Sequence, residues 1–202
     1  MSLKEERAIA QKYIGDFPWF MVTWGLGGFF GWIALFPLVH LGYIPMWLGC
    51  VLATIIICYC YLPTHEAQHG NIGRPGTRWR WLNEFIGHTS AFPSLVPYRL
   101  HRAIHLKHHA HANDNERDPD IYIRADSIWG AAWNAYMSKQ PGQAGALTEN
   151  VIEDSGQKQK LVMEALVVTR IGWLIMLILA WSGFALELLM LWWLPRAIAG
   201  IY

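Results

Sequence analysis

Two long runs without a charged side chain lie close together near the start of the chain. They cover residues 19–41 and 46–62, and the turn Gly42-Tyr43-Ile44-Pro45 separates them. A helix needs about 20 apolar residues to cross about 30 Å of hydrocarbon, and each run reaches or nearly reaches that length. Glycine and proline inside such runs are tolerated in membrane helices. We therefore expect a transmembrane helical hairpin over residues 19–62.

A second apolar region, residues 161–202, has room for two further spans at about 165–181 and 184–202. Between the hairpins, residues 63–160 are rich in Lys and Arg. The N-terminal arm, residues 1–18, is mixed in charge but contains Lys4, Arg7 and Lys12, whereas the first turn has neither Lys nor Arg. By the positive-inside rule, the N-terminus and the middle region face the cytoplasm. The sequence predicts an all-α integral membrane protein in which two transmembrane helical hairpins flank a cytosolic, helical, histidine-rich region.

Charge and cysteine content exclude two other classes of protein. The formal net charge is +1, so no strong positive field points to a nucleic-acid partner. The three cysteines, Cys50, Cys58 and Cys60, all lie in the second apolar run, which is not the pattern of a disulfide framework. A membrane protein without a nucleic-acid partner remains.

The histidines are concentrated between the two predicted hairpins. Only His40 lies in a span, and we expect His40 and the isolated His88 to be structural. His65 and His69 follow the second run and are four residues apart, so a helix would present both on one face. Pro63 suits a helix start and Thr64 could cap it.

A second histidine cluster follows in "HRAIHLKHHAH". At about 100° per residue, His101, His105, His108 and His109 fall within an arc of roughly 100°, and His111 falls outside it. Imidazoles without thiolates suit Zn, Fe, Cu or Ni. The sequence therefore predicts a metal site beside the membrane, with His101 and His111 as possible extra ligands and these main ligands: His65, His69, His105, His108 and His109.

Two other functions compete for these residues. "HEAQH" is an HExxH motif beside a predicted span, which in an intramembrane zinc metalloprotease supplies two ligands and Glu66 as general base. That interpretation leaves the second cluster unexplained, because three ligands and a water already fill a catalytic zinc site. A non-enzymatic metal-binding or transport protein is the third alternative, but ions crossing the bilayer need polar groups inside the spans, and the first hairpin offers few.

The two clusters resemble the histidine boxes of the membrane fatty acid desaturase and hydroxylase superfamily. "HEAQH" is similar to the first box, HxxxH, and "HLKHH" to the second, HxxHH; the resemblance runs from about residue 20 to 202. "HAHANDNERDPD" also resembles a stretch of carotenoid hydroxylases and some acyl desaturases. The resemblance implies a non-haem di-iron centre, with two iron ions held by histidines of three boxes and O₂ as co-substrate. The implied enzyme is an oxygen-dependent acyl-lipid desaturase or, alternatively, a carotenoid hydroxylase or ketolase.

The resemblance also implies roles for particular residues and partners. By motif position, box one supplies His65 and His69, and box two supplies His105, His108 and His109. The resemblance suggests no catalytic residue beyond the metal ligands. The implied partners are a lipid substrate, either an acyl chain or a carotenoid, and a separate electron donor such as a ferredoxin or cytochrome. The residues expected to orient the imidazoles through hydrogen bonds are Glu66, Asn71 and Asp114.

The third box that the resemblance implies does not occur in the sequence. It should follow the fourth membrane segment as another HxxHH, yet no histidine follows His111. We therefore expect these 202 residues to be a piece of a longer protein, and that piece to be catalytically incomplete.

Overall fold

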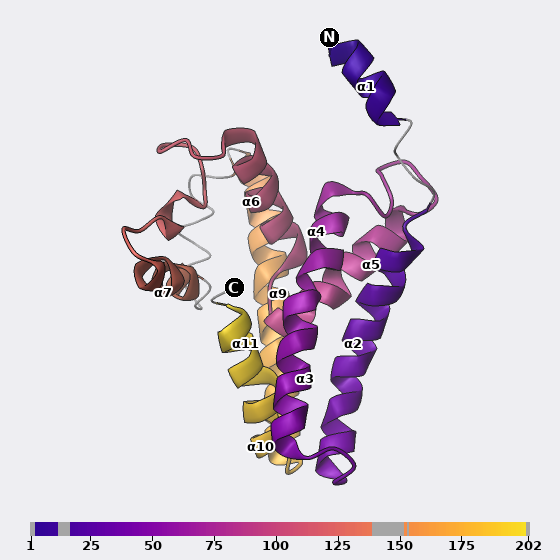
Figure 1. Ribbon diagram of the computed structural model, residues 1–202, viewed down its shortest axis with the longest axis vertical. Helices are drawn as coiled ribbons and strands as arrows, with labels where there is room; N and C mark the ends of the chain where they lie inside the picture. The colour runs from indigo at the N-terminus through magenta and orange to yellow at the C-terminus, as the bar shows by residue number, and fades with distance from the viewer. Residues whose placement is uncertain (1–2, 12–16, 139–151, 153, 201–202) are drawn as a thin grey trace.

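Every regular element in the part of the chain that the structure describes is a helix (Figure 1). This computed structural model describes residues 3–11, 17–138, 152 and 154–200. The predicted all-α fold is confirmed. In chain order the elements are α1 (Leu3–Gln11), α2 (Trp19–His40), α3 (Met46–Tyr59), α4 (Tyr61–His69), α5 (Arg80–Ala91), η1 (Phe92–Ser94), α6 (Tyr98–His111), η2 (Ile121–Ile123), α7 (Ile128–Ser138), α9 (Ser155–Trp181), α10 (Ala185–Leu188), η3 (Leu189–Trp193) and α11 (Leu194–Ala199).

The first helical hairpin agrees closely with the sequence prediction. α2 and α3 run side by side and are joined by a short turn at one end of the molecule (Figure 1). Gly42 in that turn has a φ of 77°, a conformation that glycine adopts without steric cost. Both helices are long and apolar enough to cross a membrane when α4 is counted with α3 as one continuous segment, Met46–His69.

The third apolar helix, α9, begins ten residues before the expected span at 165–181. Asp154 precedes it and accepts a hydrogen bond from the Gln157 N–H at 2.6 Å, so a side-chain cap defines the start of α9. The early turns, "SGQKQK", are polar, and only the later turns are apolar. The sequence prediction was too short because it counted only the apolar part. α9 is the third of the described helices that could cross a membrane by length and composition.

The expected fourth span, residues 184–202, is helical but irregular in its described part. Among the described residues this segment forms three consecutive pieces, α10, the π-helical turn η3, and α11, and it is not one of the three helices long enough to span. In a π turn the regular i to i−4 pairing is interrupted, and the Leu191 carbonyl accepts a hydrogen bond from Trp32 Nε1 at 2.9 Å. A hydrogen bond from α2 therefore ends at a carbonyl of the π-helical turn. The segment from α10 to α11 still returns alongside α9 as a hairpin (Figure 1).

Tryptophans hold the two hairpins together. Trp32 and Trp192 are almost fully buried, and their ring centroids lie 4.9 Å apart in an edge-to-face arrangement. Trp192 Nε1 donates to the Pro93 carbonyl at 2.8 Å, and Arg196 Nε donates to the Ser94 carbonyl at 3.0 Å. The end of the second hairpin is thereby attached to η1. The short helices α4, α5 and α6 lie at the end of the bundle opposite its two hairpin turns (Figure 1).

Candidate metal centre

The first histidine pair lies on α4, which almost continues α3. Cys60 between the two helices has helical backbone angles, so Thr64 lies inside a helix, where its Oγ1 donates to the Cys60 carbonyl at 2.8 Å instead of capping a helix start as expected. α4 ends at Gly70, whose left-handed φ of 74° is typical of a helix C-terminus. His65 and His69 share one face of α4, and their ring centroids lie 4.6 Å apart.

Side chains of the neighbouring helices bind the last carbonyls of α4. The final carbonyls of any helix lack partners within it. The Ala67 carbonyl accepts hydrogen bonds from the Tyr98 hydroxyl at 2.8 Å and from Asn83 Nδ2 at 2.9 Å. The Gln68 carbonyl accepts one from Arg102 Nε at 2.7 Å. Since Asn83 belongs to α5 and both Tyr98 and Arg102 belong to α6, these bonds fix the two histidine-bearing helices against each other.

Four histidines from α4 and α6 meet at the contact between these helices. His105 Nε2 lies 3.1 Å from His69 Nε2 and 3.1 Å from His109 Nε2. The His65 ring completes the group, with its centroid 4.8 Å from that of His105. One nitrogen of each imidazole lies within 4.8 Å of the others. We call His65, His69, His105 and His109 the four-histidine cluster.

The spacing and protonation of the cluster fit a metal ion. Imidazole nitrogens bound to a metal at about 2.1 Å lie about 3.0 Å apart at right angles and about 3.4 Å apart at tetrahedral angles, a range that includes the observed 3.1 Å. Burial, followed by the charges of neighbouring histidines, of which His65 has the largest effect, lowers the pKa of His105 to about 3. His105 is therefore neutral at pH 7, as a metal ligand must be.

His108 is turned away from this cluster toward an acidic loop. Because successive helical residues differ by about 100°, His108 and His109 cannot point the same way. His108 Nδ1 lies 2.7 Å from Asp118 Oδ1 and 3.7 Å from Asp120 Oδ2, and these three residues form a second group that could hold a metal ion. The backbone folds back to allow this pairing at Asn113, which has a φ of 64° that asparagine tolerates better than most residues.

Asp118 is well suited to orient His108. Its buried carboxylate also accepts hydrogen bonds from the backbone N–H groups of Asn113 at 2.7 Å and Asp120 at 2.9 Å. Burial acts to raise the pKa of Asp118, but these hydrogen bonds and the one with His108 outweigh it, so the pKa is lowered. A charged Asp118 that accepts from Nδ1–H leaves Nε2 of His108 available for a metal.

The residues expected to orient imidazoles differ in their placement. Glu66 Oε1 lies 3.5 Å from His65 Nδ1, and its Oε2 accepts a hydrogen bond from Asn71 Nδ2 at 2.8 Å. Asp114 binds within its own turn, where it accepts hydrogen bonds from Arg117 Nε at 2.7 Å and from the backbone. The pairing of Glu66 with Asn71 does not favour the zinc-protease alternative, in which this carboxylate faces a metal-bound water.

The two possible extra ligands lie outside the four-histidine cluster. His101 Nδ1 contacts the amide nitrogen of the fully buried Gln68, which lies between the histidines of α4. His111, near the end of α6, belongs to neither group of possible metal ligands among the described residues.

Sequence reasoning missed several residues that position the site. Asn83 and Tyr98 are far from the histidines of α4 in sequence, and neither residue type signals such a role. Asp118 and Asp120 belong to the "DPD" stretch, which marks an acidic loop after the second cluster. Spacing alone could not show that Asp118, and not Asp114, folds back onto His108.

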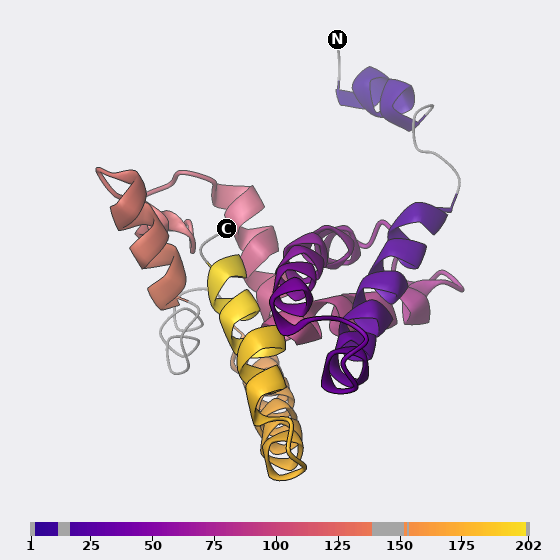
Figure 2. The ribbon, with the colours of Figure 1, turned by 60° about the horizontal axis from the view of Figure 1, so that its bottom comes forward.

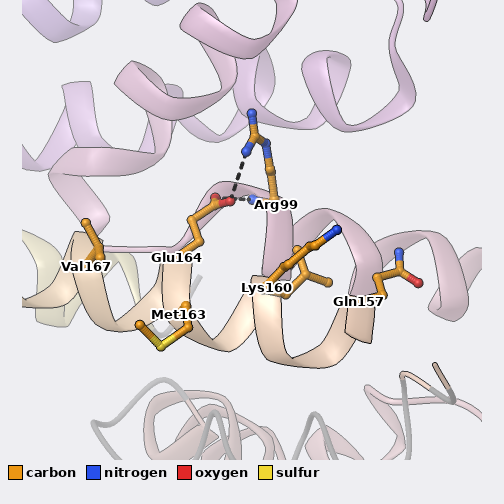
Figure 3. Close-up of a pocket in the computed structure, with 7 residues that line it drawn as sticks. Arg99, Gln157, Lys160, Met163, Glu164 and Val167 are labelled. Carbon is orange, nitrogen blue, oxygen red and sulfur yellow. Dashed lines mark hydrogen bonds and ion pairs between the residues drawn. The ribbon is translucent and has the colours of Figure 1, made fainter. Parts of the chain in front are cut away.

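A separate surface hollow lies between the start of α6 and the first turns of α9 (Figure 3). Arg99 beside it donates from Nε to Glu84 at 2.7 Å and from Nη1 to Glu164 at 3.3 Å, so the ion pairs join α5, α6 and α9. None of the predicted ligands lines this hollow, and it is not part of the metal centre. Its lining residues are Arg99, Gln157, Lys160, Leu161, Met163, Glu164 and Val167.

An all-α bundle with helices able to cross a membrane, and with clustered histidines at one end, defines a membrane protein with a candidate metal centre. Comparison with known proteins identifies its family: the fatty acid desaturase family matches residues 41–202. The chain belongs to the fatty acid desaturase family.

Three curated relatives share local similarity with the chain. The sn-1 acyl-lipid omega-3 desaturase (ferredoxin) of Synechocystis sp. is 38% identical over 58 residues, which are 29% of this chain and 15% of the relative. The protein of the same name from Nostoc sp. is 33% identical over 63 residues, covering 31% and 16%. The sn-1 oleoyl-lipid 12-desaturase of Picosynechococcus sp. is 26% identical over 82 residues, covering 37% and 22%. The matched part is thus less than a quarter of each relative's length, and no solved structure shows a significant match.

Proposed function

We propose that this chain is part of an oxygen-dependent acyl-lipid desaturase whose histidines hold iron. The observation that carries the proposal is the four-histidine cluster at the contact of α4 and α6, in a chain of the fatty acid desaturase family. All three relatives are named as desaturases of oleoyl or acyl lipids, which favours an acyl chain over a carotenoid as substrate.

The proposed reaction removes two hydrogens from adjacent carbons of the acyl chain and forms a double bond. O₂ is the oxidant, and together with two electrons and two protons it is reduced to two molecules of water. Bound iron would supply the oxygen-dependent removal of hydrogen from an unactivated C–H bond. Two of the relatives carry "ferredoxin" in their names, so we propose a ferredoxin-like protein as the electron donor.

The chain's own residues contribute position and protonation state. His105 and His109 from α6, with His65 and His69 from α4, each place one imidazole nitrogen within 4.8 Å of the others, and the lowered pKa of His105 keeps that imidazole neutral. His108 presents its Nε2 while Asp118 holds its Nδ1, and both belong to the proposed ligand environment. Because the cluster adjoins the end of an apolar helix, Met46–His69, a lipid chain could reach it without leaving an apolar environment.

We also propose that the histidine region faces the cytoplasm, where a soluble electron donor would reach it. The support is the distribution of Lys and Arg, which are frequent in residues 63–160 and absent from the turn between α2 and α3. A reporter fused to residue 42 that is active only in the cytoplasm should stay inactive in bacterial cells. An active reporter there would reverse the topology.

Metal content of the purified membrane protein tests the proposed site. Replacing His105 with Ala, at the centre of the cluster, should remove most of the bound iron, whereas His40→Gln at the opposite end of α2 should leave it unchanged. Fatty acid analysis of a host that expresses the complete reading frame and a ferredoxin should show a new double bond. Zinc in place of iron, or equal iron in the His105→Ala and wild-type proteins, would contradict the proposal.

A further inference from the structure

Helix α7 exposes its largest apolar side chains. Ile128 and Trp129 are each 85% exposed, and Trp133 is 62% exposed. The small residues of α7, Gly130 and three alanines, are by contrast only half-exposed. A helix of a water-soluble domain shows the reverse arrangement, with large apolar groups inside and a polar face outside.

The exposed side chains form one continuous face. Trp129, Trp133 and Met137 are spaced four residues apart, so they lie within an arc of roughly 80°. No residue of α7 carries a charge. An uncharged helix with two outward tryptophans on one face requires an apolar environment to cover that face.

The direction and height of α7 fit the surface of a lipid bilayer. α7 runs across the bundle: it is foreshortened in Figure 1, where the long apolar helices run vertically, and is seen along its length in Figure 2. In Figure 1, α7 lies level with the end of α11, the last helix of the second hairpin. Arg196 lies at the end of the second hairpin, where a charged side chain can reach the edge of the membrane. Ile198 in the same turn of α11 is 44% exposed, so this end of the hairpin also presents apolar surface.

We propose that α7 is a membrane-surface helix whose Trp129–Trp133 face lies at the boundary between lipid headgroups and acyl chains. Tryptophan and tyrosine are enriched at that boundary because their rings are apolar but carry a polar N–H or O–H group. A helix that lies in the membrane plane matches the orientation of α7 and the exposure of its tryptophans. A second copy of the chain would cover the same face, but it would give no reason for α7 to lie across the apolar helices at the end of a hairpin.

The membrane contact would also steady the loop beside the metal centre. α7 follows directly after the segment 112–127, which carries Asp118 to His108, and Asn134 Nδ2 donates to the Arg124 carbonyl at 3.4 Å. Lipid bound to α7 would thus hold one end of that loop. The proposal does not depend on iron binding or on desaturase activity.

Tryptophan fluorescence in lipid nanodiscs that hold one copy of the protein tests the inference. Phosphatidylcholine brominated near the headgroup end of the acyl chains quenches tryptophans only at short range. The reference variant is Trp47→Phe, which removes an exposed tryptophan of α3. We expect the double variant Trp129→Phe/Trp133→Phe to lose at least as much bromolipid-quenchable emission, for each tryptophan removed, as this reference variant loses. Phenylalanine keeps the face apolar, so the fold should not change.

Two results would overturn the proposal. If bromolipid quenching is the same in the wild type and the double variant while water-soluble acrylamide quenches the difference emission, then α7 lies in water. The emission of Trp129 and Trp133 is the difference between the wild-type and double-variant spectra. If this difference resists both quenchers in discs that hold two copies, but not in discs that hold one, then a second copy covers the face. A circular dichroism spectrum equal to that of the wild type would show that the double variant is folded.

Discussion

The hydrogen bonds between Asn83, Tyr98 and Ala67 should control the geometry of the four-histidine cluster, and two substitutions separate their effects. Asn83 is fully buried and takes part in three bonds: Nδ2 donates to the Ala67 carbonyl at 2.9 Å and to the Tyr98 hydroxyl at 3.2 Å, and Oδ1 accepts from the Gly73 N–H at 3.2 Å. Replacement with Ala removes all three bonds and leaves the buried Gly73 N–H without its partner. Each buried hydrogen bond contributes about 1 kcal/mol net, so Asn83→Ala should cost about 3 kcal/mol.

Tyr98→Phe is the matched comparison. It removes the hydroxyl that donates to Ala67 at 2.8 Å and accepts from Asn83 Nδ2 at 3.2 Å, but the Ala67 carbonyl keeps its bond from Asn83 and the Gly73 N–H keeps its partner. Two bonds are lost, so the cost should be about 2 kcal/mol. For a chain of this size about 1 kcal/mol corresponds to about 2–4 °C, so we expect a fall in melting temperature of about 6–12 °C for Asn83→Ala and about 4–8 °C for Tyr98→Phe.

The assay is thermal unfolding in detergent, followed by the metal content of protein kept below its melting temperature. Asn83→Ala should also lower iron affinity, because ligand sets tolerate only about 0.5 Å of displacement and α4 would lose its hydrogen bond to α5 at Ala67. Equal melting temperatures for the two variants would refute the argument that the unpaired Gly73 N–H makes the difference. Unchanged iron affinity in a destabilised Asn83→Ala protein would show that this network supports the fold without setting the cluster.

Three further predictions concern the loop, a close helix contact and pH. Asp118→Asn keeps the shape of the side chain but removes the charge beside His108, so metal titration should show an affinity about 10- to 100-fold lower. Asp114→Asn is the control, because Asp114 binds within its own turn, and it should change the affinity little. Equal losses in the two variants would show that Asp118 does not position His108. Gly87→Ala places a methyl group against the Tyr98 ring and should destabilise the protein by about 1–3 kcal/mol, while Gly27→Ala, which has nothing within 4 Å, should leave the melting temperature the same or higher. Burial lowers the pKa of His88 despite the opposing effect of Glu164, so the unfolded chain takes up a proton that the folded chain does not as the pH falls below about 6.5. The free energy of unfolding should therefore decrease as the pH is lowered below about 6.5, and denaturant titrations should find a smaller decrease in His88→Asn. An identical pH dependence in the two proteins would assign the effect to other groups.

The helices and the main histidine pairs could be predicted from the sequence because both are local patterns. The uncharged run at 19–41 became α2, and the spacing of four within "HEAQH" placed His65 and His69 on one face, as helix periodicity requires. The same spacing placed His105 and His109 together on α6. These features depend only on the hydrophobic period and on about 100° of rotation per residue.

The features that could not be predicted depend on contacts between distant residues. Trp32 contacts the Leu191 carbonyl across 159 positions of sequence, and that contact accompanies the π turn that interrupts the expected fourth span. Likewise, the choice of Asp118 over Asp114 as the partner of His108 depends on the reversal at Asn113. The outward tryptophans of α7 could be listed from sequence, but only the three-dimensional structure shows that nothing in the described chain covers them.

The arrangement of ligands bears directly on how many ions this chain can hold. The four imidazoles of the cluster have nitrogens within 4.8 Å of one another, so they form one all-imidazole group of possible metal ligands. Among the described residues, the other group of this kind is His108 with Asp118 and Asp120, which offers one imidazole and two carboxylates. Carboxylate-rich groups and all-imidazole groups prefer different metals. In addition, Asp118 already accepts hydrogen bonds from His108 and two backbone N–H groups. Within the described residues, the geometry therefore offers two distinct groups of possible ligands: one made only of imidazoles between α4 and α6, and one around His108 in which Asp118 would hold Nδ1 and leave Nε2 available.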